Sequence, residues 1–189
     1  IYDDILTGSL AGSEGFEGNA GNDVIDGGGH SGPGFGDFAN YVNSATTGII
    51  FNLSSATVSG VASNTATDGL GGTDTLINVD SVNGSQFGDL LIGNSNDNFL
   101  RGFGGADTIH GGDGNDTLLL TGTTAIDLAE YNVGTHDDEG QVAHTIFGVG
   151  AAPDNVQRVF FSGLEPVVEV VAAAALDIDA TNANNAINY

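Results

Sequence analysis

Gly-rich and apolar positions alternate at a fixed interval through residues 84–119. Cut into nines, this stretch reads GSQFGDLLI, GNSNDNFLR, GFGGADTIH and GGDGNDTLL, with Gly first and an apolar residue eighth in every row. A short fixed period indicates identical units stacked along an axis, each too small to bury a core by itself. The pattern therefore predicts a solenoid.

Each row predicts a turn followed by a very short strand. Positions one to five are rich in Gly, which reaches the positive φ values of tight turns at no steric cost. Positions six to nine alternate polar and apolar residues, which predicts a strand with one side chain directed inward. Two rows then form one flattened coil, and successive coils stack at roughly 4.8 Å. In this arrangement loop n lies against loop n+2, and the loops form two edges.

The sixth position supplies a side-chain oxygen in all four rows, from Asp89, Asn98, Asp107 and Asp116. Stacked carboxylates repel one another, and the single Leu or Ile of each strand buries little apolar surface. We therefore expect a cation between the loops. Carbonyl and carboxylate oxygens in a compliant Gly loop suit Ca²⁺ far better than Mg²⁺ or a transition metal.

The row at 111–119, GGDGNDTLL, resembles the Gly-Gly-x-Gly-x-Asp-x-apolar-x nonapeptide of the repeats-in-toxin (RTX) proteins. Four rows in register carry this resemblance. It implies a parallel β-roll that folds on binding Ca²⁺ outside the cell after type I secretion. The expected fold class is therefore all-β, a parallel β-roll or β-solenoid with Ca²⁺-binding Gly-rich turns, followed by a further β-rich region.

The rest of the chain divides into three parts around a roll core at 69–120. Residues 1–40 hold degenerate rows, of which 18–26 is nearly complete and offers Asp23. Glu14 and Asp37 fit the same position only if their loops carry extra residues, so each is either a ligand or a solvated loop acid. Residues 41–68 read as a strand-containing spacer.

Residues 69–77 restore the nine-residue row, with Asp74 at its sixth position, and 78–82 follow as an extra strand-like piece. From 121 to 189 the nonapeptide is absent, and strand-like runs between Gly, Pro or acidic turns predict a β-rich region that caps or extends the roll. Pro166 could instead begin a helix. The four Val among the next five residues favour a strand.

If the loops alternate between edges, those beginning at Gly69, Gly93 and Gly111 share one edge, and those at Gly84 and Gly102 share the other. This arrangement predicts ions between loops 69 and 93, 93 and 111, and 84 and 102, within a total of about three to six. Asn98 offers a neutral oxygen, so its site should be weaker. The full set of expected metal ligands is Asp23, Asp74, Asp89, Asn98, Asp107, Asp113, Asp116, Gly69, Gly71, Gly84, Gly93, Gly102, Gly104 and Gly111.

Charge and composition narrow the function. The net charge is −23 and the only basic residues are Arg101 and Arg158, which disfavours nucleic acid and anionic membranes as partners. Without Cys, a secreted fold must be held by metal or packing. No apolar run approaches the length of a membrane span, and neither an initial Met nor a signal peptide is visible. We therefore expect a segment of a longer protein that does not insert into membranes.

Catalytic motifs are absent from the sequence. Neither the His-Glu-x-x-His helix of zinc proteases nor the Gly-x-Ser-x-Gly elbow of lipases occurs, so we expect no catalytic residues and no enzyme. Each His stands alone, and His110, at an outward ninth position, is expected on the surface. The number of Asp and Glu residues does not by itself exclude the chemistry of a glycosidase, which uses a pair of carboxylates. Ca²⁺ explains their regular spacing better.

Two function classes remain. The first is a calcium-binding structural module of a secreted or cell-surface protein, such as an adhesin, filament or matrix component. Its solenoid ends could stack on other copies of the chain. The alternative is the accessory roll of a type I-secreted enzyme or toxin whose catalytic domain lies outside this chain. Both classes place the protein outside the cell, with calcium as its ligand.

Overall fold

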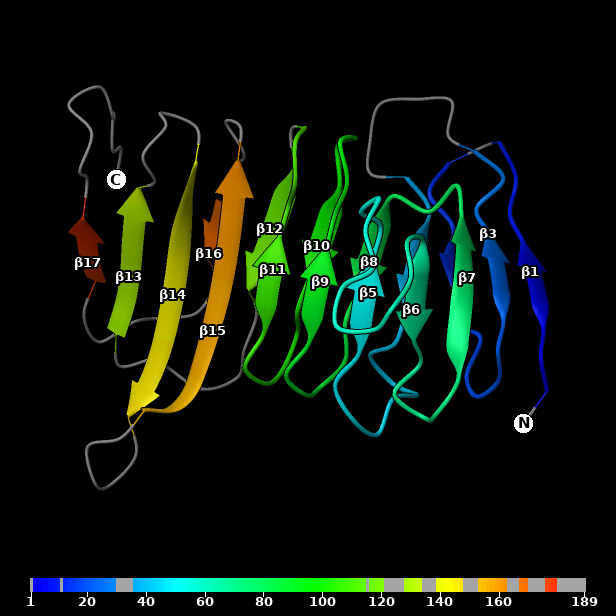
Figure 1. The fold of residues 1–189 in the computed structure, drawn as a ribbon, viewed down its shortest axis with the longest axis horizontal. Coiled ribbons are helices and arrows are strands. Elements are labelled where there is room, and N and C mark those ends of the chain that lie inside the picture. The colour runs from blue at the N-terminus through cyan, green and yellow to red at the C-terminus, as the bar shows by residue number, and fades with distance from the viewer. Residues whose placement is uncertain are drawn as a thin grey trace.

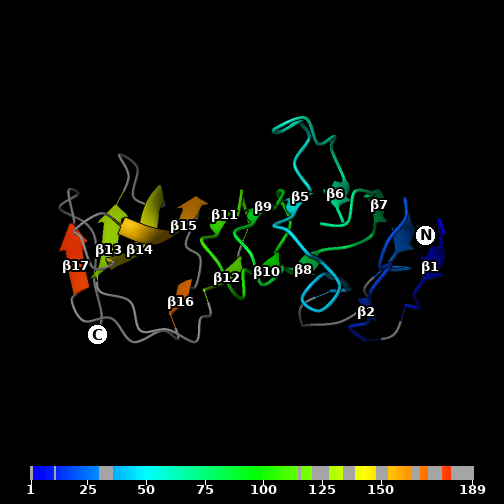
Figure 2. The ribbon, with the colours of Figure 1, turned by 90° about the horizontal axis from the view of Figure 1, so that it is seen from below.

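The computed structural model describes residues 2–10, 12–29, 36–114 and 116–120, and the strands between 128 and 179. Every regular element among these residues is a β-strand. The strands form two sheets that run side by side along the long axis (Figures 1 and 2). The all-β expectation is therefore confirmed. Within the described residues, no helix is long and apolar enough to cross a membrane.

The first sheet has 11 strands, and the second has 6. In spatial order, the first contains β1 (Ile5–Thr7), β3 (Val24–Asp26), β7 (Thr73–Ile77), β6 (Thr65–Thr67), β5 (Ile50–Asn52), β9 (Leu90–Ile92), β11 (Thr108–His110), β15 (Pro153–Ser162), β14 (Glu139–Phe147), β13 (Leu128–Val133) and β17 (Leu176–Asp179). The second contains β16 (Val167–Glu169), β12 (Thr117–Leu120), β10 (Phe99–Arg101), β8 (Ser81–Asn83), β4 (Phe38–Asn40) and β2 (Gly15–Phe16).

The nonapeptide rows build the coils as expected. From β8 to β12 the chain alternates between the two sheets at every strand. β9 pairs in parallel with β11, where Leu91 faces Ile109, and β10 pairs in parallel with β12, where Leu100 faces Leu118. The paired residues lie two rows apart in the sequence. Two rows therefore make one coil, and each strand stacks on the strand of the next coil.

The eighth position of each row forms the core. Leu91, Leu100, Ile109 and Leu118 are all 0% exposed and belong to one buried cluster between the sheets. Burying an aliphatic side chain of this size contributes about 1.5–3 kcal/mol. The cluster continues toward the N-terminus through Ile25, Ala39, Phe51 and Val82, so the degenerate rows and the spacer share the same core.

The spacer adds an antiparallel hairpin to the roll. β5 pairs in parallel with β9 and antiparallel with β6, and β6 pairs antiparallel with β7. The strand of the expected row at 69–77, β7, is the second arm of this hairpin, and it also pairs in parallel with the row strand β3, where Leu76 lies beside Ile25. Asp68 closes the turn, since its Oδ1 accepts hydrogen bonds from the backbone N–H groups of Leu70 (2.7 Å) and Gly72 (2.8 Å).

The expected edge of loop 69 is wrong. The strand-like piece before Gly84 is β8, in the second sheet, so the chain crosses between the sheets through the short turn 78–80. Loops 69–72 and 84–89 both lead into a strand of the first sheet and lie at the same edge. Loop 69–72 stacks on the loop of the row 18–26, because β7 pairs with β3. No ion can therefore bridge loops 69 and 93.

The β-rich region beyond residue 120 extends both sheets. β15 pairs in parallel with β11, and β16 pairs in parallel with β12. β14 then pairs antiparallel with both β15 and β13. The residues after Pro166 form the strand β16 rather than the start of a helix. The remainder of that segment, 170–175, lies outside the described residues.

Candidate metal sites

The sixth-position side chains are buried along the two edges of the roll. Asp74, Asn98, Asp107 and Asp116 are 0% exposed, and Asp23 and Asp89 are also buried. Removing a carboxylate from water costs several kcal/mol unless hydrogen bonds or a counter-charge compensate. The hydrogen-bond donors or cations that offset the cost of burying each side chain therefore decide what the edges can bind.

One oxygen of each carboxylate caps the preceding coil. Asp107 Oδ1 accepts a hydrogen bond from the backbone N–H of Asp89 (3.0 Å), and Asp116 Oδ1 accepts one from Asn98 (2.8 Å). Asp23 Oδ1 accepts one from the N–H of Asp4 (2.7 Å) in the same way. An acceptor is required at this place because the N–H group points along the stack at the start of its strand.

The second oxygen lies against the first-position Gly of the same row. A Cβ atom added to Gly102 would overlap Asp107 Oδ2, one added to Gly84 would overlap Asp89 Oδ2, and one on Gly93 would overlap Asn98 Oδ1. Gly is therefore required at position one by this close approach. Positive φ values occur at the next positions of the loops instead, at Phe103, Gly105, Gly112 and Gly114.

Stacked loops add backbone carbonyls beside these side chains. The carbonyl oxygens of Arg101 and Gly102 and the Oδ2 of Asp89 all surround the position of a Cβ on Gly84. The carbonyl oxygen of Gly111 and the Oδ1 of Asn98 meet in the same way beside Gly93. The expected stacking of loop 84 on loop 102, and of loop 93 on loop 111, is confirmed.

Other residues of the expected ligand set lie at the rims of these loops. Gly104 packs against Gln86 of the stacked loop, and Asp113 is exposed. His110 is half-buried rather than on the surface, and burial lowers its pKa. At physiological pH this imidazole is therefore neutral and adds no positive charge to the edge.

The first segment follows the same geometry at the two residues that the sequence left open. Asp37 is 0% exposed, and its Oδ1 accepts a hydrogen bond from the backbone N–H of Glu14 (2.7 Å). The carboxylates of Asp37 and Glu14 lie against Gly27 and Gly8, respectively. Both therefore occupy sixth positions, and Asp37 is not a solvated loop acid. The sequence signal for this position was the two-residue spacing from Asp37 to Ala39, which equals the spacing from the sixth to the eighth position of a row.

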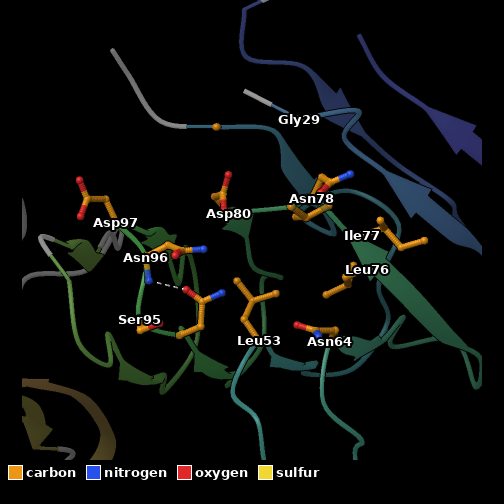
Figure 3. A pocket seen from close by; sticks show the side chains of 13 residues that line it. Gly29, Leu53, Asn64, Leu76, Ile77, Asn78, Asp80, Ser95, Asn96 and Asp97 are labelled. Atoms are coloured by element: carbon orange, nitrogen blue, oxygen red, sulfur yellow. Dashed lines mark hydrogen bonds between the residues drawn. The ribbon is translucent and has the colours of Figure 1, made fainter. Parts of the chain in front are cut away.

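A groove interrupts the loop stack at one edge. The turn 78–80 is shorter than a row loop, and a groove of about 950 Å³ lies above it, between Gly36 and residues 94–97. Figure 3 shows Asp80 at the middle of this groove and Asp97 at one side. The turn still contacts both neighbours, since the N–H of Asp80 donates to the carbonyl of Asp37 (3.2 Å) and the carbonyl of Asp80 accepts from Asn98 Nδ2 (2.9 Å).

Asp74 is held differently from the row carboxylates. Its Oδ1 accepts a hydrogen bond from the N–H of Asp23 (3.1 Å), and its Oδ2 accepts one from the hydroxyl of Tyr41 (2.9 Å). Sequence reasoning missed Tyr41, because an aromatic residue in a spacer gives no signal of a contact 33 residues away. Gly69, in turn, directs its carbonyl to Thr46, whose N–H donates to it at 3.2 Å.

Burial shifts the protonation of these groups. Desolvation, the largest cause, raises the pKa of Asp74 to about 6, and it raises the pKa of Asp89 to about 6 as well. The pKa of Tyr41 lies well above its ordinary value, mainly because of burial and secondly because of the charge of Asp74. The edge that carries Asp74 and Asp89 therefore disfavours further negative charge.

The donor set fits Ca²⁺. The Oδ2 atoms of Asp23 and Asp37 are buried and have no hydrogen-bond partner in the described part of the chain. Within that part, no group of three or more carboxylate or His side chains gathers around one point. An ion at these edges would therefore take most of its ligands from backbone carbonyls, which Ca²⁺ accepts readily.

A comparison with protein families decides what these rows are. The family model of the RTX calcium-binding nonapeptide repeat matches four copies, at residues 11–31 and 83–118. The chain carries RTX repeats. RTX repeats bind Ca²⁺ and are typical of secreted proteins, so the chain contains a calcium-binding module. The matched segments leave out 69–77. A search of the curated proteins found no match to the chain.

Proposed function

We propose that this chain is a calcium-binding structural module of a secreted or cell-surface protein, and that it folds and becomes rigid on binding Ca²⁺ outside the cell. The observation that carries the proposal is the line of buried sixth-position carboxylates beside stacked loop carbonyls. In such a site the free energy of ion binding is also free energy of folding. Extracellular Ca²⁺ is abundant enough to fill sites with dissociation constants of about 10⁻⁴–10⁻³ M.

The proposed ion sites follow the stacked RTX loops. One lies between loops 84 and 102, with ligands from Asp89, Asp107, Gly84, Gly102 and Gly104. A second lies between loops 93 and 111, with ligands from Asn98, Asp113, Asp116, Gly93 and Gly111. Asp23 and Asp37 provide ligands in the first segment, where each has a buried oxygen without a hydrogen-bond partner among the residues that the structure describes.

Counting the bound ions tests the proposal directly. We expect native mass spectrometry to show about three to six Ca²⁺ per chain, and no retention of Mg²⁺ at the same concentration. Mg²⁺ is disfavoured because it demands a small octahedral site and loses its water reluctantly. A chain that stays folded and retains no Ca²⁺ would overturn the proposed function.

We further propose that the module stacks end to end on other copies of itself. β1 is the edge strand of the first sheet, and among the described strands it pairs with β3 alone. Its Ile5 is 78% exposed, and the nearby Tyr2 is 82% exposed. An open strand edge with exposed apolar side chains favours the addition of another strand.

Sedimentation velocity in Ca²⁺ measures this association. We expect the sedimentation coefficient to rise with protein concentration, and Ile5→Lys to abolish the rise, because a Lys at an edge strand blocks pairing. Phe87→Lys is the matched control, since Phe87 is also exposed but lies in loop 84–89. A chain that is monomeric at every concentration would favour the accessory role.

A further inference from the structure

Tyr41 stands at the join between the first roll segment and the spacer. It follows β4 directly, and only 2% of its surface is exposed. Its backbone N–H donates to the carbonyl of Asn83 (2.9 Å), and its hydroxyl donates to Asp74 Oδ2 (2.9 Å). The phenol therefore spans the core, from the second sheet to the first sheet.

The Tyr41 hydroxyl gives the second oxygen of the buried Asp74 carboxylate a hydrogen-bond donor. The other oxygen of Asp74 accepts from the backbone N–H of Asp23 (3.1 Å). Both oxygens are thus bound by neutral donors from two different segments. A hydrogen bond from a hydroxyl to a carboxylate is charge-assisted and roughly twice as strong as one between neutral groups. It requires no ion.

The loop before Asp74 presents its carbonyl cradle to a different carboxylate, because a Cβ on Gly72 would overlap the carbonyl oxygen of Gly21 and approach Oδ2 of Asp68. In the RTX rows the sixth-position oxygen lies against the first-position Gly, as Asp107 does against Gly102. Gly69 instead packs against Ala45 and the carbonyl of Thr47. The carbonyl of Gly69 accepts from the N–H and the hydroxyl of Thr46, at 3.2 and 3.0 Å. The carbonyl oxygen of Gly69 is therefore engaged within the spacer.

We propose that the Tyr41 hydroxyl takes, at Asp74, the place that Ca²⁺ takes at the sixth-position carboxylates of the RTX rows. The join between the first segment and the spacer then closes without metal. Tyr41 is thus a specificity-determining residue, because it decides which of the buried carboxylates binds an ion. This inference rests on the proposed calcium-binding function, and it removes Asp74, Gly69 and Gly71 from the set of ligands.

The dependence of the melting temperature on Ca²⁺ concentration tests the inference, because its slope reports the ions bound on folding. We expect Tyr41→Phe to lower the midpoint by roughly 3–10 °C, since it leaves a buried carboxylate oxygen without its donor, and to leave the slope unchanged. Tyr2→Phe, at an exposed tyrosine, should change neither quantity. Asp107→Asn should reduce the slope by the contribution of one ion.

A second variant decides the matter if Tyr41→Phe does not fold. In native mass spectrometry, Asp74→Asn should bind as many Ca²⁺ ions as the wild type, whereas Asp107→Asn should bind one fewer. Loss of an ion in Asp74→Asn, or a smaller slope in Tyr41→Phe, would overturn the inference. A wild-type chain whose midpoint ignores Ca²⁺ would instead contradict the proposed function, which is a distinguishable result.

Discussion

Asp107→Ala is expected to remove one Ca²⁺ ion and to destabilise the central roll. The wild-type carboxylate caps the N–H of Asp89 at 3.0 Å and lies against Gly102, where loop 84 meets loop 102. A buried N–H without its acceptor costs about 1–3 kcal/mol. A lost ion at hundredfold excess over its dissociation constant costs about 2.7 kcal/mol. The expected total of roughly 4–6 kcal/mol is comparable to the whole stability of a small domain.

Native mass spectrometry and thermal melts in Ca²⁺ measure the two parts of this effect. Asp116→Ala should behave in the same way, because Asp116 caps Asn98 at 2.8 Å. His110→Ala is the matched control, since His110 ends β11 of the same coil but occupies the outward ninth position. It should leave the ion count unchanged. If Asp107→Ala retains the full number of ions, the ligand assignment is wrong.

Acidification in Ca²⁺-free buffer should stabilise the roll. Burial raises the pKa of Asp74 and of Asp89 to about 6, from an ordinary value of 3.8. Between these pH values the folded chain binds more protons than the unfolded chain. The stability from these groups is therefore full below about pH 4 and is lost as the pH rises through about 6. With EDTA, strand content should be higher at about pH 5 than at about pH 7.5.

Ca²⁺ should reverse this dependence. The ion and the proton compete for the oxygens of Asp89, so Ca²⁺ affinity at that site falls as the pH falls through about 6. Circular dichroism at the two pH values, in EDTA and in saturating Ca²⁺, gives the comparison. Strand content that rises with pH in EDTA would contradict the burial of ionised carboxylates without a counter-ion.

The repeat made the coils predictable. A nine-residue period with Gly first and an apolar residue eighth was enough to place Leu91, Leu100, Ile109 and Leu118 in the core and to stack alternate loops. These features depend on residues within one row and on its copy two rows away. Because the same local pattern recurs, one correct interpretation of a row applies to all four.

The interruptions to the repeat were not predictable in the same way. Which edge loop 69–72 occupies depends on whether the turn 78–80 crosses between the sheets, and three residues outside the repeat do not decide this. The turn of the β6–β7 hairpin resembles an RTX loop because both require Gly. They differ because β6, the strand before the turn, lies in the same sheet as β7, and this is a property of the assembled sheet.

Glu14, Asp37 and Tyr41 show two further limits. Extra residues in the loops before Glu14 and Asp37 break the nine-residue period, although the spacing from acid to strand is kept at Asp37 and Ala39. The Tyr41–Asp74 contact joins a spacer residue to a hairpin strand across the core. Such a contact arises from the packing of whole elements, so no local sequence pattern predicts it.

Far-UV circular dichroism, recorded first in EDTA and then during a Ca²⁺ titration with Mg²⁺ as the control, tests the central claim most directly. The account predicts that a largely disordered spectrum becomes a strand spectrum cooperatively with Ca²⁺ and not with Mg²⁺, because ion binding supplies the free energy of folding. A full strand spectrum in EDTA at neutral pH that ignores added Ca²⁺ would contradict it. The RTX rows would then be a Gly-rich solenoid held by packing alone.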